Sequence, residues 1–110
     1  MDFIIEDSDL KLGQNISAVY FYASWMPFHK KMVKMINKIE EERKITFLAI
    51  DANYFKSLCK RYKIESVPTI VIFNNGKEVK RVVGLILTSA LRSIFIDICK
   101  NKEINDEKSI

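Results

Sequence analysis

The chain has 110 residues, of which 48% are hydrophobic and 29% are charged. This length suits one domain, and the composition is that of an ordinary globular protein, which excludes a wholly disordered chain. Eighteen basic and fourteen acidic side chains give a net charge of +4, an excess too small to indicate nucleic-acid binding by itself. Charged residues interrupt every apolar run before it reaches the roughly 18 residues that a membrane-spanning helix needs.

The N-terminal segment begins MDFIIED and lacks the basic start of a secretory signal, so we expect a cytoplasmic protein. Its apolar residues 3–5 predict a short edge strand. Residues 7–9 (DSD) can cap a brief helix that extends to about Leu12, and residues 13–15 (GQN) end this helix.

An apolar strand and a long amphipathic helix follow. Residues 17–22 (SAVYFY) are rich in apolar and aromatic side chains without strict alternation, which indicates a strand buried on both faces. Pro27 is tolerated in the first turn of a helix, and the helix then extends to about Arg43. Its apolar side is formed by Met32, Val33, Met35, Ile36 and Ile39. Its other side carries Lys30, Lys31, Lys34 and Lys38, which we interpret as a solvated face, with a basic docking surface as the alternative.

The middle of the chain predicts a second strand and a second helix. Residues 45–50 form an apolar run that ends at Asp51 and indicate another buried strand. Residues 54–62 fit a helix that places Phe55, Leu58 and Cys59 on one side. Strands that alternate with helices in this way indicate parallel, right-handed crossover connections.

A hairpin and a last helix complete the predicted elements. Residues 69–73 (TIVIF) and 78–83 (EVKRVV) form two strands, and residues 74–77 (NNGK) form the turn between them, because Asn-Gly supplies the positive φ angles that such a turn needs. The last helix begins at Thr88 and directs inward Leu91, Ile94, Phe95 and Ile98. We therefore predict an α/β fold with a mixed sheet of four to five strands and helices on both faces. Residues 1–100 form one domain, and residues 101–110 form a polar C-terminal tail that frays.

The two cysteines, Cys59 and Cys99, lie far apart in the chain and form no paired motif. A disulfide scaffold is therefore not expected, and with His29 as the single histidine the chain has too few ligands for a four-ligand zinc site. We expect no metal and no cofactor. The simplest role for both cysteines is that of small core residues, with a regulatory or intermolecular disulfide as the alternative.

Four segments in this order resemble the thioredoxin family. Residues 18–25 (AVYFYASW), followed by a helix, are similar to the strand that leads to the thioredoxin active site. Residues 66–69 (SVPT) resemble the family's cis-proline loop, Asn75-Gly76 its hairpin, and Gly84 the glycine after its last strand. The resemblance covers residues 17–100 and implies the thioredoxin fold with a cis peptide bond between Val67 and Pro68.

The resemblance fails at the redox motif. Where thioredoxins have Trp-Cys-Gly-Pro-Cys-Lys, residues 25–30 read WMPFHK, so that Met26 and His29 stand at the positions of the two cysteines. Thiol–disulfide exchange needs a thiolate and a second, resolving thiol, and neither a thioether nor an imidazole can replace them. Tyr20 also stands where thioredoxins have a buried aspartate that assists proton transfer. By this resemblance the protein is redox-inactive at the family's usual site, and we expect no disulfide reductase activity.

The recognition surface of the family remains. In thioredoxins the tryptophan, the cis-proline loop and the loop after the last strand line a shallow groove, where a partner's extended segment pairs with the backbone of the residue before the proline. The matching residues here are Trp25, Val67, Pro68, Gly84 and Leu85. Met26 and Phe28 are expected to make this groove more apolar than a dithiol would. Simple packing at a strand end is the alternative for Trp25.

His29 is expected to be a neutral, partly buried imidazole that fills the space of the family's second cysteine, because the positive end of the helix dipole disfavours another cation. Two alternatives are open for this residue. One is general acid or base catalysis, for which the sequence shows no partner. The other is a copper site shared with Met26, in which two ligands alone would bind weakly.

These observations lead to two main functional hypotheses. The first is a redox-inactive thioredoxin-like protein that binds a protein or peptide segment in this groove. The alternative is an oxidoreductase-related protein of cell redox homeostasis that uses Cys59 or Cys99 in an unconventional way. Nucleic-acid binding through the lysine face is a third and weaker hypothesis, and membrane binding is not expected. A homodimer that buries the groove is also open.

Overall fold

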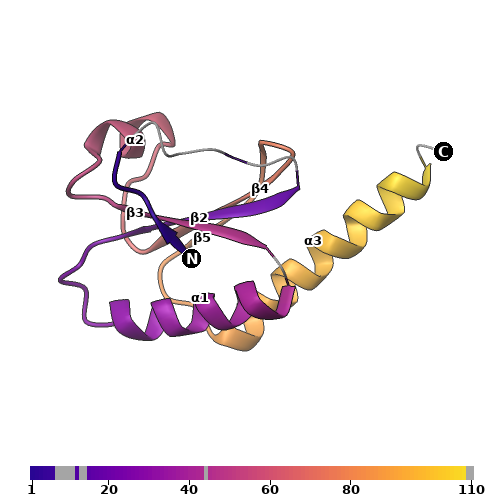
Figure 1. Ribbon diagram of the computed structural model, residues 1–110, viewed down its shortest axis with the longest axis horizontal. Helices are drawn as coiled ribbons and strands as arrows, with labels where there is room; N and C mark the ends of the chain where they lie inside the picture. The colour runs from indigo at the N-terminus through magenta and orange to yellow at the C-terminus, as the bar shows by residue number, and fades with distance from the viewer. Residues whose placement is uncertain (7–11, 13–14, 44, 109–110) are drawn as a thin grey trace.

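Five strands form one sheet in the order β1-β3-β2-β4-β5. The computed structural model describes residues 1–6, 12, 15–43 and 45–108, with 102–108 described by their backbone alone. The strands are β1 (Asp2–Phe3), β2 (Ile16–Tyr22), β3 (Thr46–Asp51), β4 (Thr69–Asn74) and β5 (Lys77–Val83). The helices are α1 (His29–Arg43), α2 (Lys56–Arg61) and α3 (Thr88–Lys108). One face of the sheet packs against α2, and the other packs against α1 and the first turns of α3 (Figure 1).

The sheet is mixed, as predicted. β3 pairs in parallel with both β1 and β2, whereas β4 pairs antiparallel with β2 and β5. The order and direction of these strands agree with the expected α/β fold. The N-terminal edge strand is confirmed but shorter and earlier than predicted, since β1 ends at Phe3 and Ile4 leaves the strand while its N–H still donates to the Ala49 carbonyl at 2.9 Å.

β2 lies in the middle of the sheet and is buried on both faces. Alternate side chains of a strand point to opposite faces. Ala18 and Tyr20 accordingly join the core beneath α1 and α3, whereas Val19 and Phe21 join the core beneath α2. All four are fully buried, which confirms the interpretation of residues 17–22 as a strand without a solvent-exposed face.

The apolar face of α1 attaches this helix to the sheet. Met32, Met35, Ile36 and Ile39 are buried, and Val33 packs partly buried beside them. Burying one such side chain contributes roughly 1.5–3 kcal/mol. The opposite face carries the four exposed lysines, Lys30, Lys31, Lys34 and Lys38. The predicted amphipathic helix is therefore confirmed, with its solvated side as expected.

α2 is shorter than the helix predicted for residues 54–62. Asp51, the last residue of β3, organises a turn before it. The Asp51 carbonyl accepts hydrogen bonds from the N–H groups of Tyr54 and Phe55 at 3.2 and 2.9 Å, and its carboxylate accepts one from the N–H of Asn53 at 2.9 Å. Since the first residues of this segment are committed to that turn, regular helix begins only at Lys56. Of the three residues expected on the apolar side, Phe55 and Leu58 are buried and Cys59 is half-buried.

α2 ends in a backbone motif that places a lysine in the left-handed region. Lys63 has a φ of 55°. The N–H of Lys63 donates to the Lys60 carbonyl at 3.2 Å, and the N–H of Ile64 donates to the Cys59 carbonyl at 2.8 Å. This is the Schellman arrangement, in which glycine usually occupies the position held here by Lys63.

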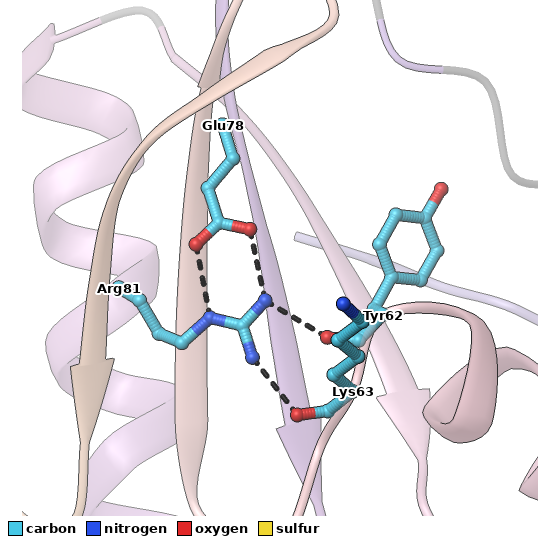
Figure 2. Close-up of polar contacts among 4 residues, drawn as sticks. All are labelled: Tyr62, Lys63, Glu78 and Arg81. Carbon is cyan, nitrogen blue, oxygen red and sulfur yellow. Dashed lines mark hydrogen bonds and ion pairs between the residues drawn. The ribbon is translucent and has the colours of Figure 1, made fainter.

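Arg81 of β5 joins this helix end to the sheet. Its guanidinium donates to the carbonyls of Tyr62 and Lys63 at 2.8 and 3.0 Å. Glu78 accepts two further hydrogen bonds from the same guanidinium at 2.8 and 3.0 Å, which holds it in place (Figure 2). A side chain from β5 thereby satisfies the carbonyls of the two residues that follow α2.

The remaining elements follow the sequence with one correction. Asn75 and Gly76 have φ angles of 53° and 81°, as the Asn-Gly turn predicts. The last helix extends into the segment predicted as a polar tail, because α3 continues through Lys108 and projects beyond the sheet (Figure 1). Residues 101–108 (NKEINDEK) contain no glycine or proline to end a helix and include the strong helix formers lysine and glutamate.

Two further points concern the described part of the chain. The short helix predicted for residues 7–12 lies outside the described residues apart from Leu12, which is not helical and packs against the core beneath α2. Among the helices of the described ranges, none has the length and apolar character needed to cross a bilayer.

Candidate functional site

The segment that replaces the redox motif is a tight turn between β2 and α1. The N–H of Met26 donates to the Ala23 carbonyl at 3.0 Å, and the N–H of His29 donates to the Met26 carbonyl at 3.2 Å. The side chain of Met26 points inward and is 9% exposed, whereas Trp25 is 72% exposed. The expectation that Met26 adds apolar surface to a groove is therefore wrong. Its thioether is part of the core beneath α1 and α3.

His29 is held by two tyrosines of β2. Its Nδ1 lies 3.1 Å from the hydroxyl oxygen of Tyr20, and its ring stacks on Tyr22 with the ring centroids 4.5 Å apart. Burial lowers the pKa of His29 below its ordinary value, although the charge of Asp51 partly opposes this shift. Burial, together with the neighbouring Tyr22, raises the pKa of the fully buried Tyr20.

His29 and Tyr20 are therefore both uncharged at physiological pH. A protonated Tyr20 hydroxyl can donate to the unprotonated Nδ1 of His29, which leaves the proton of the imidazole on Nε2. This agrees with the predicted neutral, half-buried histidine. Sequence reasoning missed Tyr20 as its partner, although Tyr20 and Tyr22 alternate along one strand and so share a face. It also missed the carboxylate of Asp51, which lies opposite Tyr22 in the sheet.

The proline loop and the glycine after β5 are directly connected. The Val67–Pro68 peptide bond is cis, as the resemblance implies, and Gly84 has a φ of 90°. The N–H of Gly84 donates to the Pro68 carbonyl at 2.8 Å. In the part of the chain that the structure describes, neither backbone group of Val67 has an intramolecular hydrogen-bond partner. The predicted neighbours Pro68 and Gly84 are thus brought together, with a free peptide edge beside them.

The predicted groove is divided into two hollows. Phe28 and Leu85 line the first, which we call the apolar groove. It has a volume of about 390 Å³. Its lining is completed by Lys31, Met32, Met35, Ile86, Leu87 and Thr88. Val67 instead lines a second hollow of about 490 Å³ together with Cys59, and Trp25 lines neither. After Gly84 the chain runs across to α1 (Figure 1), and Leu85 accordingly lines the hollow that residues of α1 also line.

Leu87 is a residue of the apolar groove that sequence reasoning missed. It is 76% exposed, more than Leu85 or Phe28. The signal was present in the run Leu85-Ile86-Leu87, which follows Gly84 and precedes the last helix. Three apolar residues in an expected loop, where polar residues are usual, are a signal of exposed apolar surface.

Both cysteines are free and half-buried. The thiol of Cys59 lies 3.9 Å from the Ala52 carbonyl oxygen, and burial, followed by the charge of Asp51, raises its pKa. Cys99 packs against the core beneath α1 and α3. Within the described ranges, no group of three or more His, Cys, Asp or Glu residues is arranged to hold a metal ion.

Comparison with known proteins places this geometry in a family. A sequence model of thioredoxin matches residues 7–97. The chain is 33% identical to thioredoxin-2 of Saccharomyces cerevisiae over 79 residues, which are 71% of this chain and 76% of the yeast protein. It is also 33% identical to the chloroplastic thioredoxin Y of Oryza sativa over 87 residues, which are 77% of this chain. The chain spans only about half of that rice protein (52%).

Solved structures of thioredoxins share this fold. A mutant thioredoxin from Halobacterium salinarum NRC-1 superposes with a TM-score of 0.77 at 24% identity, over 84% of this chain and 85% of that one. The thioredoxin of Trypanosoma brucei brucei superposes with a TM-score of 0.72 at 25% identity, over 79% of this chain and 77% of that one. The chain therefore belongs to the thioredoxin family.

Proposed function

We propose that this thioredoxin-family protein performs no thiol–disulfide exchange at the family's motif and instead binds a segment of another protein. One observation carries the proposal. The two motif positions hold a buried thioether, Met26, and an imidazole, His29, that is bonded to Tyr20 and stacked on Tyr22. A thioether has no proton to lose, so it cannot form the thiolate that attacks a disulfide.

The alternative is a redox activity carried by Cys59 or Cys99. The relatives are named thioredoxins, which favours this alternative. Against it stands the state of Cys59, whose raised pKa keeps it as a protonated, weakly nucleophilic thiol at neutral pH. Exchange also needs a resolving thiol, and Cys59 and Cys99 pack against the cores on opposite faces of the sheet.

Segment binding is supported by groups that have no partner in the described part of the chain. Val67 presents a free backbone edge within the described residues, and an extended peptide can add to such an edge through main-chain hydrogen bonds. Trp25, Phe28, Leu85 and Leu87 offer exposed apolar surface elsewhere on the described part of the chain, and apolar pockets are what give such binding its selectivity. A protein or peptide segment is therefore the proposed partner.

Redox inactivity is tested by the reduction of insulin disulfides with dithiothreitol as the electron source. We expect no acceleration by the wild type, and acceleration by the Met26→Cys/His29→Cys double variant, which restores both thiols to the fold. Acceleration by the wild type that is lost in Cys59→Ser or Cys99→Ser would establish the alternative. Circular dichroism checks that each variant is folded.

Binding is tested by selecting random peptides from a display library on the immobilised full chain. We expect enriched peptides whose binding is weakened by Trp25→Ala and by Leu85→Glu. Val79→Glu is the matched control for Leu85→Glu, because Val79 is a comparably exposed apolar residue, 46% against 55%, on the outer strand β5. Peptides that bind all variants equally, or a library with no enrichment, would remove this surface as the functional one.

A further inference from the structure

The apolar groove has an open, apolar wall and a charged end. Phe28, Leu85 and Leu87 are 45%, 55% and 76% exposed around a hollow of about 390 Å³. Buried methionines, Met32 and Met35, form its floor. Exposed apolar side chains gathered around a concavity are typical of a binding site rather than of ordinary surface. Lys31 is the charged member of its lining.

The apolar groove continues into a third hollow, which we call the lysine hollow because three lysines line it. Its volume is about 500 Å³, and Lys34, Lys38 and Arg92 line it together with Lys31, Met35 and Thr88. The last three residues also line the apolar groove, so the two hollows are adjacent parts of one surface. This surface lies where the first turns of α3 run beside α1 (Figure 1).

The positive charge of the lysine hollow is only partly neutralised by the protein. Arg92 is bound by Glu42, whose carboxylate oxygens lie 2.8 and 3.1 Å from the guanidinium. That carboxylate is thereby occupied. Within the described ranges, Lys31 and Lys34 form no ion pair, and both are exposed. The surface therefore combines an apolar hollow with two lysines that have no anionic partner among the described residues.

We propose that this surface binds a protein segment in which apolar side chains stand next to a run of aspartate or glutamate. This inference rests on the proposed function and names the chemistry of the partner. The apolar side chains fill the hollow between Phe28 and Leu87, and the carboxylates pair with Lys31 and Lys34. Complementary charge of this kind speeds association and selects the partner.

Other anionic partners fit the surface less well. A bilayer surface presents no single apolar group shaped to a hollow of about 390 Å³, whereas a peptide side chain does. A nucleic acid would match the lysines but would leave the aliphatic part of the groove, Leu85 and Leu87, without a corresponding apolar group. A flexible peptide segment satisfies both halves at once.

The test begins with the composition of peptides that the display library yields on the full chain. We expect enriched peptides to combine apolar and acidic residues, and their affinity, measured by fluorescence anisotropy, to fall with added salt. The Lys31→Glu/Lys34→Glu variant should weaken a selected peptide about tenfold, and Leu87→Ser should weaken it about fivefold. Matched controls are Lys77→Glu/Lys80→Glu and Val79→Ser on β5, which should bind within about twofold of the wild type.

Several results would overturn the inference. Enriched peptides without an acidic excess, or undiminished binding by Lys31→Glu/Lys34→Glu, would show that the lysines select no partner. If Trp25→Ala still abolished binding in that case, the proposed function would stand without this inference. No enrichment of any peptide would refute both the proposed function and this inference. Tighter, lysine-dependent binding to phosphatidylserine vesicles or to a single-stranded oligonucleotide would assign the surface to those ligands. A dimer lost in Leu87→Ser would assign it to a second copy of the chain.

Discussion

Replacement of Arg81 by methionine should destabilise the protein by about 2 kcal/mol. Methionine keeps the apolar stem and removes the guanidinium, which bonds the carbonyls of Tyr62 and Lys63 and the carboxylate of Glu78. Charge-assisted hydrogen bonds contribute up to roughly 1.5–3 kcal/mol each, but the side chains of Arg81 and Glu78 are 27% and 41% exposed. Allowing for solvent screening, each carbonyl bond contributes about 0.5–1 kcal/mol and the ion pair about 0.5 kcal/mol.

The contribution of the carbonyl hydrogen bonds can be separated from that of the ion pair with Glu78. Glu78→Gln removes the charge of the carboxylate but leaves both carbonyl bonds of Arg81, so it should cost only about 0.5 kcal/mol. Arg81→Met removes the ion pair and both carbonyl hydrogen bonds, and the carbonyls of Tyr62 and Lys63 then have no side-chain donor. Urea denaturation followed by circular dichroism gives both free energies of unfolding. In a domain of this size, 2 kcal/mol corresponds to a fall in melting temperature of about 8 °C.

Lys80→Met is the control, since Lys80 is an exposed cation on the same strand and its loss should leave stability within about 0.5 kcal/mol of the wild type. Equal losses for Arg81→Met and Glu78→Gln would refute the reasoning, because the carbonyl bonds would then contribute nothing. A loss in Arg81→Met no larger than that of Lys80→Met would refute the whole connection between β5 and α2.

Three further predictions follow from the same geometry. Lys63→Gly should stabilise the protein by about 0.5 kcal/mol, because it relieves the positive φ of Lys63 at some cost in unfolded-state entropy. Lys60→Gly inside α2 is the control and should destabilise the protein by about 1 kcal/mol. Denaturant unfolding measures both changes, and a destabilising Lys63→Gly would contradict the first prediction. Tyr20→Phe should destabilise the protein by about 1 kcal/mol, because it removes the hydroxyl that donates to Nδ1 of His29. It should also raise the pKa of His29, because that hydrogen bond favours the unprotonated ring, while the burial that lowers this pKa remains. An unchanged pKa in a proton NMR titration would refute the hydrogen bond. The folded state lowers the pKa of His29, so the stability that the neutral imidazole contributes is complete above about pH 6.5 and is lost as the pH falls through the folded-state pKa. Between pH 7 and 5 the wild type should therefore lose more stability than His29→Asn. Parallel curves of stability against pH for the two proteins would contradict this prediction.

Much of the fold could be read from local pattern. Residues 17–22 lack a polar face and therefore had to be a strand covered on both sides, and β2 is such a strand. The Asn75-Gly76 pair predicted its own turn, because few other dipeptides tolerate two successive positive φ angles. The boundaries of α2 and α3 were less accessible. The start of α2 is shifted by the turn around Asp51. The end of α3 was predicted from the polarity of the last residues, and polarity predicts exposure better than it predicts the absence of a helix.

The candidate site was predicted in its parts but not in its arrangement. Pro68 and Gly84 are neighbours, as expected. Phe28 and Leu85 share one hollow, whereas Val67 lines another and Met26 is buried. Which side of a loop faces a groove depends on where the chain goes next, and the path from Gly84 to α3 is set by packing against α1.

The sequence by itself determined the absence of thiols at positions 26 and 29, since the chemistry of a side chain does not depend on the fold around it. It also determined the strand and helix order, because hydrophobic period and turn residues act over a few neighbouring positions. Only the tertiary structure decided that Tyr20 forms a hydrogen bond with His29, that Arg81 holds the end of α2, and that Lys31 and Leu87 line one groove. These pairs are separated along the chain and are brought together by strand register and helix packing, which no local pattern records.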